Sequence, residues 1–256
     1  MSALLDILAT QGQVSVEEAV AALGVSPATV RRDLALLDQQ RLATRTHGGA
    51  VASGSSFDLP LRLKTERAAA EKRRIAEAAA TLVPLGAIVA FNGGTTTLEV
   101  ARALAARPDL AGAQGHGPAL TIVTNAVNLA SEMLVRPYFR VVVTGGVVRA
   151  HSFELYGPLA DRSVEGMSVG TVFVGVNGFD PEFGASAHSD VEASINSRLV
   201  KVAGRVVVVA DSTKIGVTAF AQICPPHEVD ILVTDTGVPP DMVERIRAQG
   251  IEVMIV

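Results

Sequence analysis

The chain has 256 residues, 48% of them hydrophobic, and a formal net charge of −4 at pH 7. This composition supports one or two packed α/β domains and excludes a protein that binds a polyanion over its whole surface. The single cysteine, Cys224, excludes an internal disulfide and a metal site built from several cysteines, and we expect no metal and no cofactor.

The first 24 residues predict two helices. The stretch MSALLDILATQG lacks the basic segment of a signal peptide, and no apolar run in the chain reaches the length of a membrane span. We therefore expect a cytoplasmic protein without a membrane partner. Leu4, Leu5 and Leu8 indicate an amphipathic helix that ends at Gly12. The segment 15–18, SVEE, is a capping box that begins a second helix, which ends near Gly24.

The stretch from Val25 to Val51 predicts a helix that enters a DNA groove. Ser26 is a suitable N-cap, and Pro27 occupies the first helical position, where a missing N–H costs nothing. Residues 30, 34 and 37 (Val, Leu, Leu) form an apolar stripe on one face. Small polar groups and arginines lie on the other side, which suits major-groove and phosphate contacts. The residues expected to contact DNA here are Ser26, Ala28, Thr29, Arg31 and Arg32.

A two-stranded wing follows this helix in the sequence. Residues 42–46 predict a strand, Gly48 and Gly49 a tight turn, and residues 50–51 the returning strand, so that Arg45 and His47 lie on the wing. The pattern predicts a winged helix-turn-helix domain over residues 1–55. The competing interpretation is that the arginines form only a solvated helix face.

The positive charge of this region is small. Residues 26–51 hold four arginines and two aspartates, which gives a net charge of +2 with His47 neutral. A dimer or larger assembly roughly doubles the phosphate contacts by using two half-sites. We therefore expect a homo-oligomer, either a dimer or a tetramer, on a double-stranded DNA operator.

A break and a charged helix separate this domain from the rest of the chain. The segment 53–56, SGSS, has the composition of a flexible linker. Residues 61–83 read as a helix with a net charge of +3, interpreted as solvated, with a secondary contact to DNA or to another subunit as the alternative. Residues 56–83 are therefore predicted to be a linker and connecting helix, and Pro84 and Gly86 to begin the second domain.

Residues 84–256 alternate short apolar runs with helical stretches. Runs rich in Val and Ile are typical of strands buried on both faces of a parallel sheet. The fold class predicted for this domain is a Rossmann-like α/β sandwich with a mostly parallel sheet. The strands are expected at 87–91, 120–124, 140–144, 171–176, 206–210, 231–234 and 251–255. Helices are expected at 96–106, 127–134, 190–203 and 240–249.

Polar and glycine-rich residues follow five of these strands. Ligands of open α/β sheets bind beyond the carboxyl ends of the strands. The segment 92–97, NGGTTT, leads directly into a helix, so its backbone amides and hydroxyls suit a phosphate. The other strand ends carry TN at 124–125, GG at 145–146 followed by Arg149, NG at 177–178 and DSTK at 211–214. Together they predict a site for a phosphorylated small molecule. His151 and His188 are interpreted as surface groups.

Several of these motifs resemble one known family. The blocks SPATVRRDL and RTHGGAV, followed by NGGTTT, TN, TGG, GVNGFDPEFG and ADSTK, are similar in order and spacing to DeoR-type bacterial transcriptional regulators. The resemblance implies an effector domain like ribose-5-phosphate isomerase that senses a phosphorylated sugar. It also implies that Asp211 orients Lys214. The effector site that follows comprises Asn92, Gly93, Gly94, Thr95, Thr96, Thr124, Asn125, Gly145, Gly146 and Lys214.

Two positions depart from the family pattern. Arg41 stands where the family usually has glycine, and Asn92 stands where it often has aspartate. Glycine at position 41 would accept a left-handed helix end at little cost. The amide of Asn92 removes a negative charge that would repel an anion, and also removes a carboxylate suited to proton abstraction.

Two functions of different class fit these observations. The first is a regulator, most simply a repressor of a sugar or carbohydrate catabolic operon that a phosphorylated sugar releases. The second is a sugar-phosphate isomerase, which needs a positioned general base. Its candidates are Asp180, Glu182, Asp190 and Glu192, and none lies in a catalytic motif. An isomerase would have no use for a winged helix, so we predict a regulator and not an enzyme.

Overall fold

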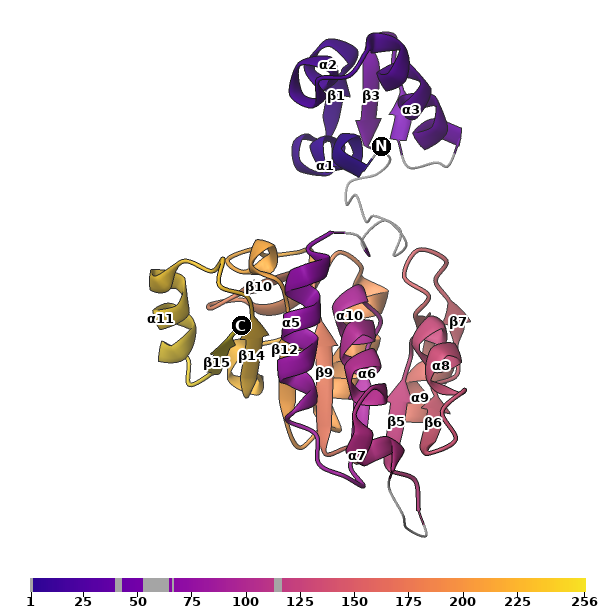
Figure 1. The fold of residues 1–256 in the computed structure, drawn as a ribbon, viewed down its shortest axis with the longest axis vertical. Helices are drawn as coiled ribbons and strands as arrows, with labels where there is room; N and C mark the ends of the chain where they lie inside the picture. The colour runs from indigo at the N-terminus through magenta and orange to yellow at the C-terminus, as the bar shows by residue number, and fades with distance from the viewer. Residues whose placement is uncertain (1, 40–42, 53–64, 66, 113–116) are drawn as a thin grey trace. The chain divides into compact units, whose positions relative to one another are not determined.

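The computed structural model describes residues 2–39, 43–52, 65, 67–112 and 117–256. The chain divides into two compact units, residues 1–63 and 64–256. Figure 1 shows the elements of each unit. Among the described residues, no helix combines the length and the apolar character needed to cross a membrane.

The first unit contains three helices and a small antiparallel sheet. The helices are α1 (Ser2–Gln11), α2 (Val16–Leu23) and α3 (Pro27–Gln39). The strands β1 (Gln13–Ser15), β2 (Ala43–Arg45) and β3 (Gly49–Ala52) pair in the order β1–β3–β2. Apolar residues from all three helices and the sheet close one core, as the helical spacing of the leucines predicts. The unit is the predicted winged helix-turn-helix.

Local side-chain bonds fix where these helices begin. Ser15 Oγ accepts from the Glu18 amide at 3.1 Å, and Glu18 Oε2 accepts from the Ser15 amide at 2.8 Å, so the predicted capping box is present. Ser26 Oγ accepts from the Thr29 amide at 3.2 Å and caps α3. Gly24 ends α2 with a φ of 64°, which glycine adopts without strain.

The second unit is built on a parallel seven-stranded sheet of order β15–β14–β12–β9–β4–β5–β6. These strands are the seven that the apolar runs predict, with ends that differ by at most one residue. They are β4 (Ile88–Phe91), β5 (Leu120–Thr124), β6 (Phe139–Val143), β9 (Thr171–Gly175), β12 (Val206–Val209), β14 (Ile231–Thr234) and β15 (Glu252–Ile255).

Helices cover both faces of this sheet (Figure 1). One face packs against α5 (Ala69–Ala80), α6 (Thr95–Ala105), α7 (Pro108–Ala111) and α8 (Val127–Met133). The other packs against α9 (Pro158–Val164), α10 (Asp190–Lys201) and α11 (Pro240–Ala248). Alternate residues of β4 serve the two cores: Val89 and Phe91 face the first, and Ala90 faces the second. Burial on both sides explains why the strands are almost purely apolar.

The helix α5 belongs to the α/β unit, which corrects its interpretation as a solvated helix. Ile75, Ala76 and Ala79 are at most 1% exposed and pack into the core beneath the first face. The small alanines allow α5 and its neighbour α6 to approach closely, while Arg73, Arg74 and Glu77 are exposed on the outer side. Residues 53–64, with the expected SGSS break, lie outside the described part of the chain.

Several short elements were not predicted. A three-stranded antiparallel sheet joins β10 (Gly178–Asp180), β11 (Gly184–Ala187) and β13 (Ala221–Cys224). A hairpin pairs β7 (Val147–Val148) with β8 (Leu155–Tyr156). Single-turn 3-10 helices, η1 (Ser212–Lys214) and η2 (Pro226–Glu228), follow β12 and β13. Strands of two to four residues are too short to show a period.

Candidate functional site

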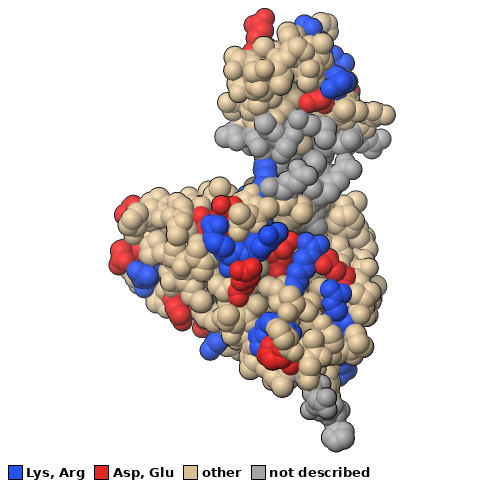
Figure 2. Space-filling view, viewed as in Figure 1, with Lys and Arg blue, Asp and Glu red and all other residues tan. Residues whose placement is uncertain are grey.

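The helix α3 presents a polar, arginine-bearing face to solvent. Val30, Leu34 and Leu37 are at most 1% exposed and anchor the opposite face in the core. Of the residues predicted to contact DNA, Thr29 is half-buried and the others in this helix region are exposed: Ser26, Ala28, Arg31 and Arg32. Figure 2 shows the Lys and Arg atoms of this unit along the side where α3 runs. This is the surface that a major-groove helix needs.

The wing is held to the rest of the unit by backbone contacts. The Thr46 amide donates to the Gly49 carbonyl at 3.0 Å and closes the turn between β2 and β3. A Cβ atom on Gly49 would lie 2.0 Å from the Val14 carbonyl oxygen, so only glycine lets β3 approach β1 there. Asp38 of α3 accepts from the Arg45 amide at 3.3 Å. Arg45 and His47 are exposed on the wing, as predicted, and Arg41 lies outside the described residues.

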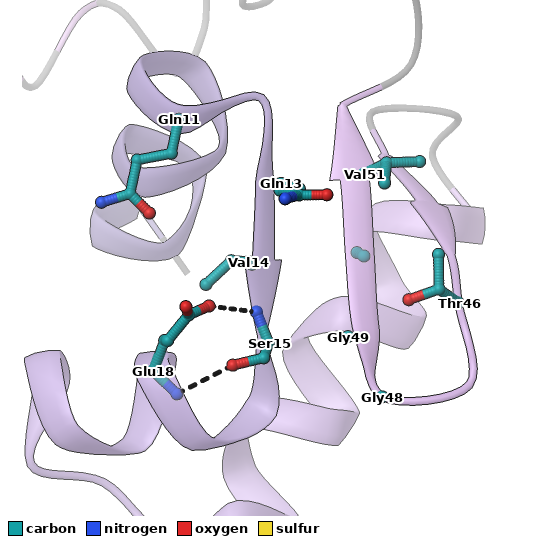
Figure 3. A pocket seen from close by; sticks show the side chains of 10 residues that line it. Gln11, Gln13, Val14, Ser15, Glu18, Thr46, Gly48, Gly49 and Val51 are labelled. Carbon is teal, nitrogen blue, oxygen red and sulfur yellow. Dashed lines mark hydrogen bonds between the residues drawn. The ribbon is translucent and has the colours of Figure 1, made fainter.

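A pocket of about 420 Å³ lies between β1, the start of α2 and the wing (Figure 3). Figure 3 shows Ser15 and Glu18 joined by their two hydrogen bonds on one side and the wing glycines across from them. Hydrogen bonds from the Ser15 amide and hydroxyl lower the pKa of Glu18. The lining includes this carboxylate and no Lys or Arg. Its charge therefore disfavours a phosphate or any other anion.

In the second unit, the glycine- and threonine-rich loop follows β4 and begins α6. Asn92 Nδ2 donates to the Gly175 carbonyl at 2.9 Å, and Asn92 Oδ1 accepts from the Gly175 amide at 2.8 Å. Asn92 is 2% exposed, and its side-chain amide joins the ends of β4 and β9 as both a donor and an acceptor. Aspartate could not donate the first of these bonds. The neutral amide that departs from the family pattern therefore has a structural role here.

The rest of the loop presents amides and hydroxyls at the start of α6. The Gly93 amide donates to Glu154 Oε1 at 2.8 Å, and a Cβ atom on Gly93 would lie 2.3 Å from Glu154 Cγ. Thr95 and Thr96 occupy the first turn of α6, where backbone amides have no helical acceptor. Thr97 Oγ1 is 3.1 Å from the carbonyl oxygens of Asn92 and Gly94, to which it donates. The geometry suits an anion on the amides around Gly94–Thr96.

The next strand end contributes Thr124 and Asn125, which are both fully buried. Thr124 Oγ1 accepts from the Ala126 amide at 3.0 Å and so shapes the turn after β5. Asn125 Nδ2 lies 3.3 Å from Glu154 Oε1 and 3.3 Å from Asn196 Oδ1. Asn125 therefore belongs to the same polar cluster as the loop, while Thr124 supports it.

The remaining predicted residues follow β6 and β12 at the same edge of the sheet. Gly145 and Gly146 form the turn from β6 into β7. Asp211 accepts from the Thr213 amide at 3.2 Å and from the Thr213 hydroxyl, and so caps the turn η1 that carries Lys214. Because β12, β9, β4, β5 and β6 are successive parallel neighbours, their carboxyl ends share one edge. The sheet therefore gathers the predicted effector residues along that edge.

Two partly or fully buried cations, Arg67 and Lys72, are not among the predicted site residues. Burial lowers the pKa of Arg67, and the Asp211 carboxylate opposes this shift. Lys72 of α5 is 5% exposed, and its ammonium donates to the Arg67 carbonyl at 2.6 Å. Lysine is seldom buried without a specific partner. In the sequence, both residues lie in the charged stretch 61–83, which is interpreted as a solvated helix.

A buried carboxylate pair was also missed. Glu154 and Glu192 are 2% and 5% exposed. Burial, and then the charge of Glu192, raise the pKa of Glu154 to about 8, while hydrogen bonds from Gly93, Asn196 and Asn125 act in the opposite direction. Glu192 Oε1 accepts from Arg149 Nη1 at 2.9 Å. Position 154 lies in the segment HSFELYG, which has no period or motif that singles it out.

The other candidate bases of the isomerase hypothesis lie apart from this pair. Asp180 accepts from the Glu182 and Phe183 amides at 2.9 and 3.0 Å within the β10–β11 turn. Glu182 is exposed and pairs with Arg245, and Asp190 is exposed at the start of α10. Glu192 alone of the four is buried in the cluster. His151 is exposed and His188 is half-buried. The described residues contain no group of three or more His, Cys, Asp or Glu placed to hold a metal ion.

Comparison with known proteins matches both units. The sequence profile of the DeoR-like helix-turn-helix domain matches residues 1–56, and that of the DeoR C terminal sensor domain matches residues 67–236. The HTH-type transcriptional regulator GlpR of Haloferax volcanii is 33% identical over 98% of this chain and 94% of its own length. The transcriptional repressor CsqR of Escherichia coli K12 is 32% identical over 98% and 93%.

Two further matches are less similar. The glycerol-3-phosphate regulon repressor of Escherichia coli K12 is 28% identical over 97% of this chain and 95% of its own length. The crystal structure of ribose 5 phosphate isomerase A from Neisseria gonorrhoeae aligns with a TM-score of 0.39 at 17% identity, over 57% of this chain and 53% of that one. The winged helix, the sensor domain and the full-length relatives agree: this chain belongs to the DeoR family of sequence-specific DNA-binding transcriptional regulators.

Proposed function

We propose that the protein represses a carbohydrate catabolic operon and that a phosphorylated sugar lowers its affinity for the operator. The observation that carries the proposal is the combination of an exposed arginine face on α3 with a glycine- and threonine-rich loop at the start of α6. The names of relatives, such as a glycerol-3-phosphate regulon repressor, support a phosphorylated metabolite as the signal.

We infer that the phosphate binds the amides around Gly94–Thr96, with Lys214 as its cationic partner. The start of a helix combines unpaired N–H groups with the positive end of the helix dipole, which favours a phosphate. The neighbouring strand ends supply Asn125, Gly145 and Gly146 for the rest of the molecule. Asn92 and Gly93 hold the loop in place through Gly175 and Glu154.

On the DNA side, the proposed contacts are Ser26, Ala28, Thr29, Arg31 and Arg32 of the α3 region and Arg45 and His47 of the wing. The small positive charge of this region favours a homo-oligomer, a dimer or a tetramer, whose paired units bind two operator half-sites. Half-sites lie about 34–36 Å apart, so a modest change in the spacing of paired units prevents simultaneous docking. The effector must bind the DNA-incompetent arrangement more tightly, since equal affinity for both would shift nothing.

The test begins with the operator. Genomic DNA fragments retained by the purified protein are sequenced, and one is used in titrations at fixed salt with and without a panel of sugar phosphates. We expect one sugar phosphate to weaken operator binding by the wild type. The variant Lys214→Ala should bind the operator equally well and lose the response, because the phosphate loses its cationic partner.

The matched control is Lys201→Ala, which removes an exposed lysine from the end of α10 and should keep the response. If Lys214→Ala responds as the wild type does, the effector site is misplaced. A coupled isomerase assay on the same sugar phosphates should show no turnover, because the proposal includes no catalytic step. Turnover would support the isomerase hypothesis instead.

A further inference from the structure

The segment that carries Glu154 runs beside the turn after β5. The Leu155 amide donates to the Asn125 carbonyl at 2.7 Å, and the Val127 amide donates to the Phe153 carbonyl at 3.0 Å. This antiparallel pairing places Glu154 opposite Ala126 and against the loop that begins α6. The Glu154 carboxylate accepts from the Gly93 amide at 2.8 Å, directly beside the amides of Gly94–Thr96.

The polar cluster around Glu154 is almost closed to solvent and holds more negative than positive groups. Glu192 from α10 contributes a second carboxylate, and Arg149 from the β7–β8 hairpin pairs with it at 2.9 Å. Asn125 and Asn196 are neutral. In the part of the chain that the structure describes, the charged groups of this cluster are therefore two carboxylates, Glu154 and Glu192, and one guanidinium, Arg149. His151, His188 and Lys214 lie in neighbouring segments of the chain.

Several polar side-chain atoms in the turn after β5, after the end of β6 and in the segment before Glu154 are buried without a hydrogen-bond partner. Asn125 is fully buried, and its Oδ1 has no hydrogen-bond partner. Thr144, which follows β6 and is 3% exposed, also has an Oγ1 without a hydrogen-bond partner. Asn128 Oδ1 and Ser152 Oγ are also buried without a partner, in the two paired segments. Buried polar atoms are usually bonded, so a concentration of unbonded ones points to a polar ligand.

We propose that Glu154 takes up a proton when an anion binds at Gly94–Thr96, so that the effector site accepts a single phosphate together with one proton. This inference rests on the proposed function, because it places the anion in the effector site. An anion on these amides would lie beside a buried carboxylate that shares the same loop. Two negative charges in one buried site repel, and the protonation of one of them removes the repulsion.

The chemistry of Glu154 fits this role. Its burial and the charge of Glu192 raise its pKa to about 8, so the proton is gained or lost near neutral pH. A bound anion raises this pKa further, which makes anion binding tighter below pH 8 and weaker above it.

Sulfate is the probe, because it stays a dianion from pH 7 to pH 9 and any linked proton must come from the protein. Sulfate is titrated into the full-length protein by calorimetry across this range. For a carboxylate with a pKa of about 8, we expect wild-type affinity to fall about tenfold between pH 7 and pH 9. In Glu154→Gln the dependence should shrink to less than about twofold. Glu244→Gln, an exposed carboxylate on α11, should behave as the wild type.

A second measurement does not depend on the variant. Wild-type titrations at pH 8 in two buffers of different ionisation enthalpy should show an uptake of about half a proton per sulfate. No uptake, or a pH dependence that persists in folded Glu154→Gln, overturns the inference. Sulfate binding by Lys214→Ala shows whether a negative result concerns proton uptake alone or the proposed anion site as well. If sulfate fails to bind, or binds Lys214→Ala as tightly as the wild type, the anion site itself is wrong and both proposals fall.

Discussion

The side chain of Asn92 and the backbone of Gly175 form a reciprocal pair of hydrogen bonds across the β4–β9 boundary. The amide donates to the Gly175 carbonyl at 2.9 Å and accepts from the Gly175 N–H at 2.8 Å, although the two residues are 83 positions apart. This pair fixes the point where the chain leaves β4 and begins the loop to α6. The position of the proposed phosphate site therefore depends on one side-chain amide.

The Asn92–Gly175 pair predicts a specific cost for aspartate at position 92. Asn92→Asp keeps the acceptor, loses the donor, and sets a carboxylate against the Gly175 carbonyl. We expect a loss of about 1–3 kcal/mol in the free energy of unfolding, the usual cost of a buried group left unsatisfied. Denaturant unfolding at neutral pH measures it. Asn177→Asp is the matched control. Asn177 Oδ1 accepts from the His188 amide at 3.1 Å, and a carboxylate oxygen can accept the same hydrogen bond. Equal losses in both variants would contradict the special role of Asn92.

The exposed arginines of α3 predict a loss of DNA affinity without a loss of folding. Arg31→Ala and Arg32→Ala should each weaken operator binding, because neither side chain is part of the core. Loss of a base contact should cost about 1–3 kcal/mol of binding free energy and relax the sequence specificity at one operator position. Loss of a phosphate contact should weaken binding to all sequences and reduce the slope of log affinity against log salt concentration by about one. Titrations at several salt concentrations distinguish the two. Arg247→Ala on α11 is the control, and wild-type affinity in both α3 variants would refute the assignment.

The core of the first unit predicts that a buried charge unfolds that unit selectively. Leu34 is 1% exposed, so Leu34→Asp places a carboxylate among apolar residues with no partner. We expect operator binding to be lost while hydrogen exchange in the α/β unit stays as in the wild type. Leu36→Asp, on the same helix but 39% exposed, should leave the first unit folded. Protection lost throughout residues 67–256 of Leu34→Asp would show that the units do not fold independently.

The buried carboxylate predicts that stability falls as the pH rises. The pKa of Glu154 is raised from 4.5 to about 8 in the folded protein, so the folded state binds more protons than the unfolded state between these values. The contribution of Glu154 to the free energy of unfolding is therefore greatest below about pH 4.5 and declines up to about pH 8.

Glu154→Gln removes this dependence and should raise the melting temperature relative to the wild type, by more at pH 8 than at pH 5. Thermal unfolding at pH 5, 6.5 and 8 measures the difference. The Gln oxygen can still accept from the Gly93 amide. Glu244→Gln should give a constant difference, because that side chain is exposed. A constant difference for Glu154→Gln would mean that the carboxylate is not destabilised by burial.

Local patterns in the sequence predicted the fold class, the helices of the first unit and the strands of the seven-stranded sheet. The capping box at Ser15 and Glu18, the stripe of Val30, Leu34 and Leu37, and the seven apolar runs each arise from contacts within one helix or strand. Period and capping therefore identify them without knowledge of the neighbours. The polar strand ends also lie along one edge of the sheet, because the strands that precede them are parallel neighbours.

The tertiary structure decided which residues complete the site. Glu154 reaches Gly93 across 61 positions, and Asn125 reaches Asn196 across 71, so no local pattern links them. The burial of Ile75 and Lys72 depends on the packing of α5 against α6 and the sheet, which a charged stretch conceals. The sequence by itself determined where polar groups leave the strands. The packing of distant segments decided which of those groups lose contact with water, and burial is what perturbs their charge.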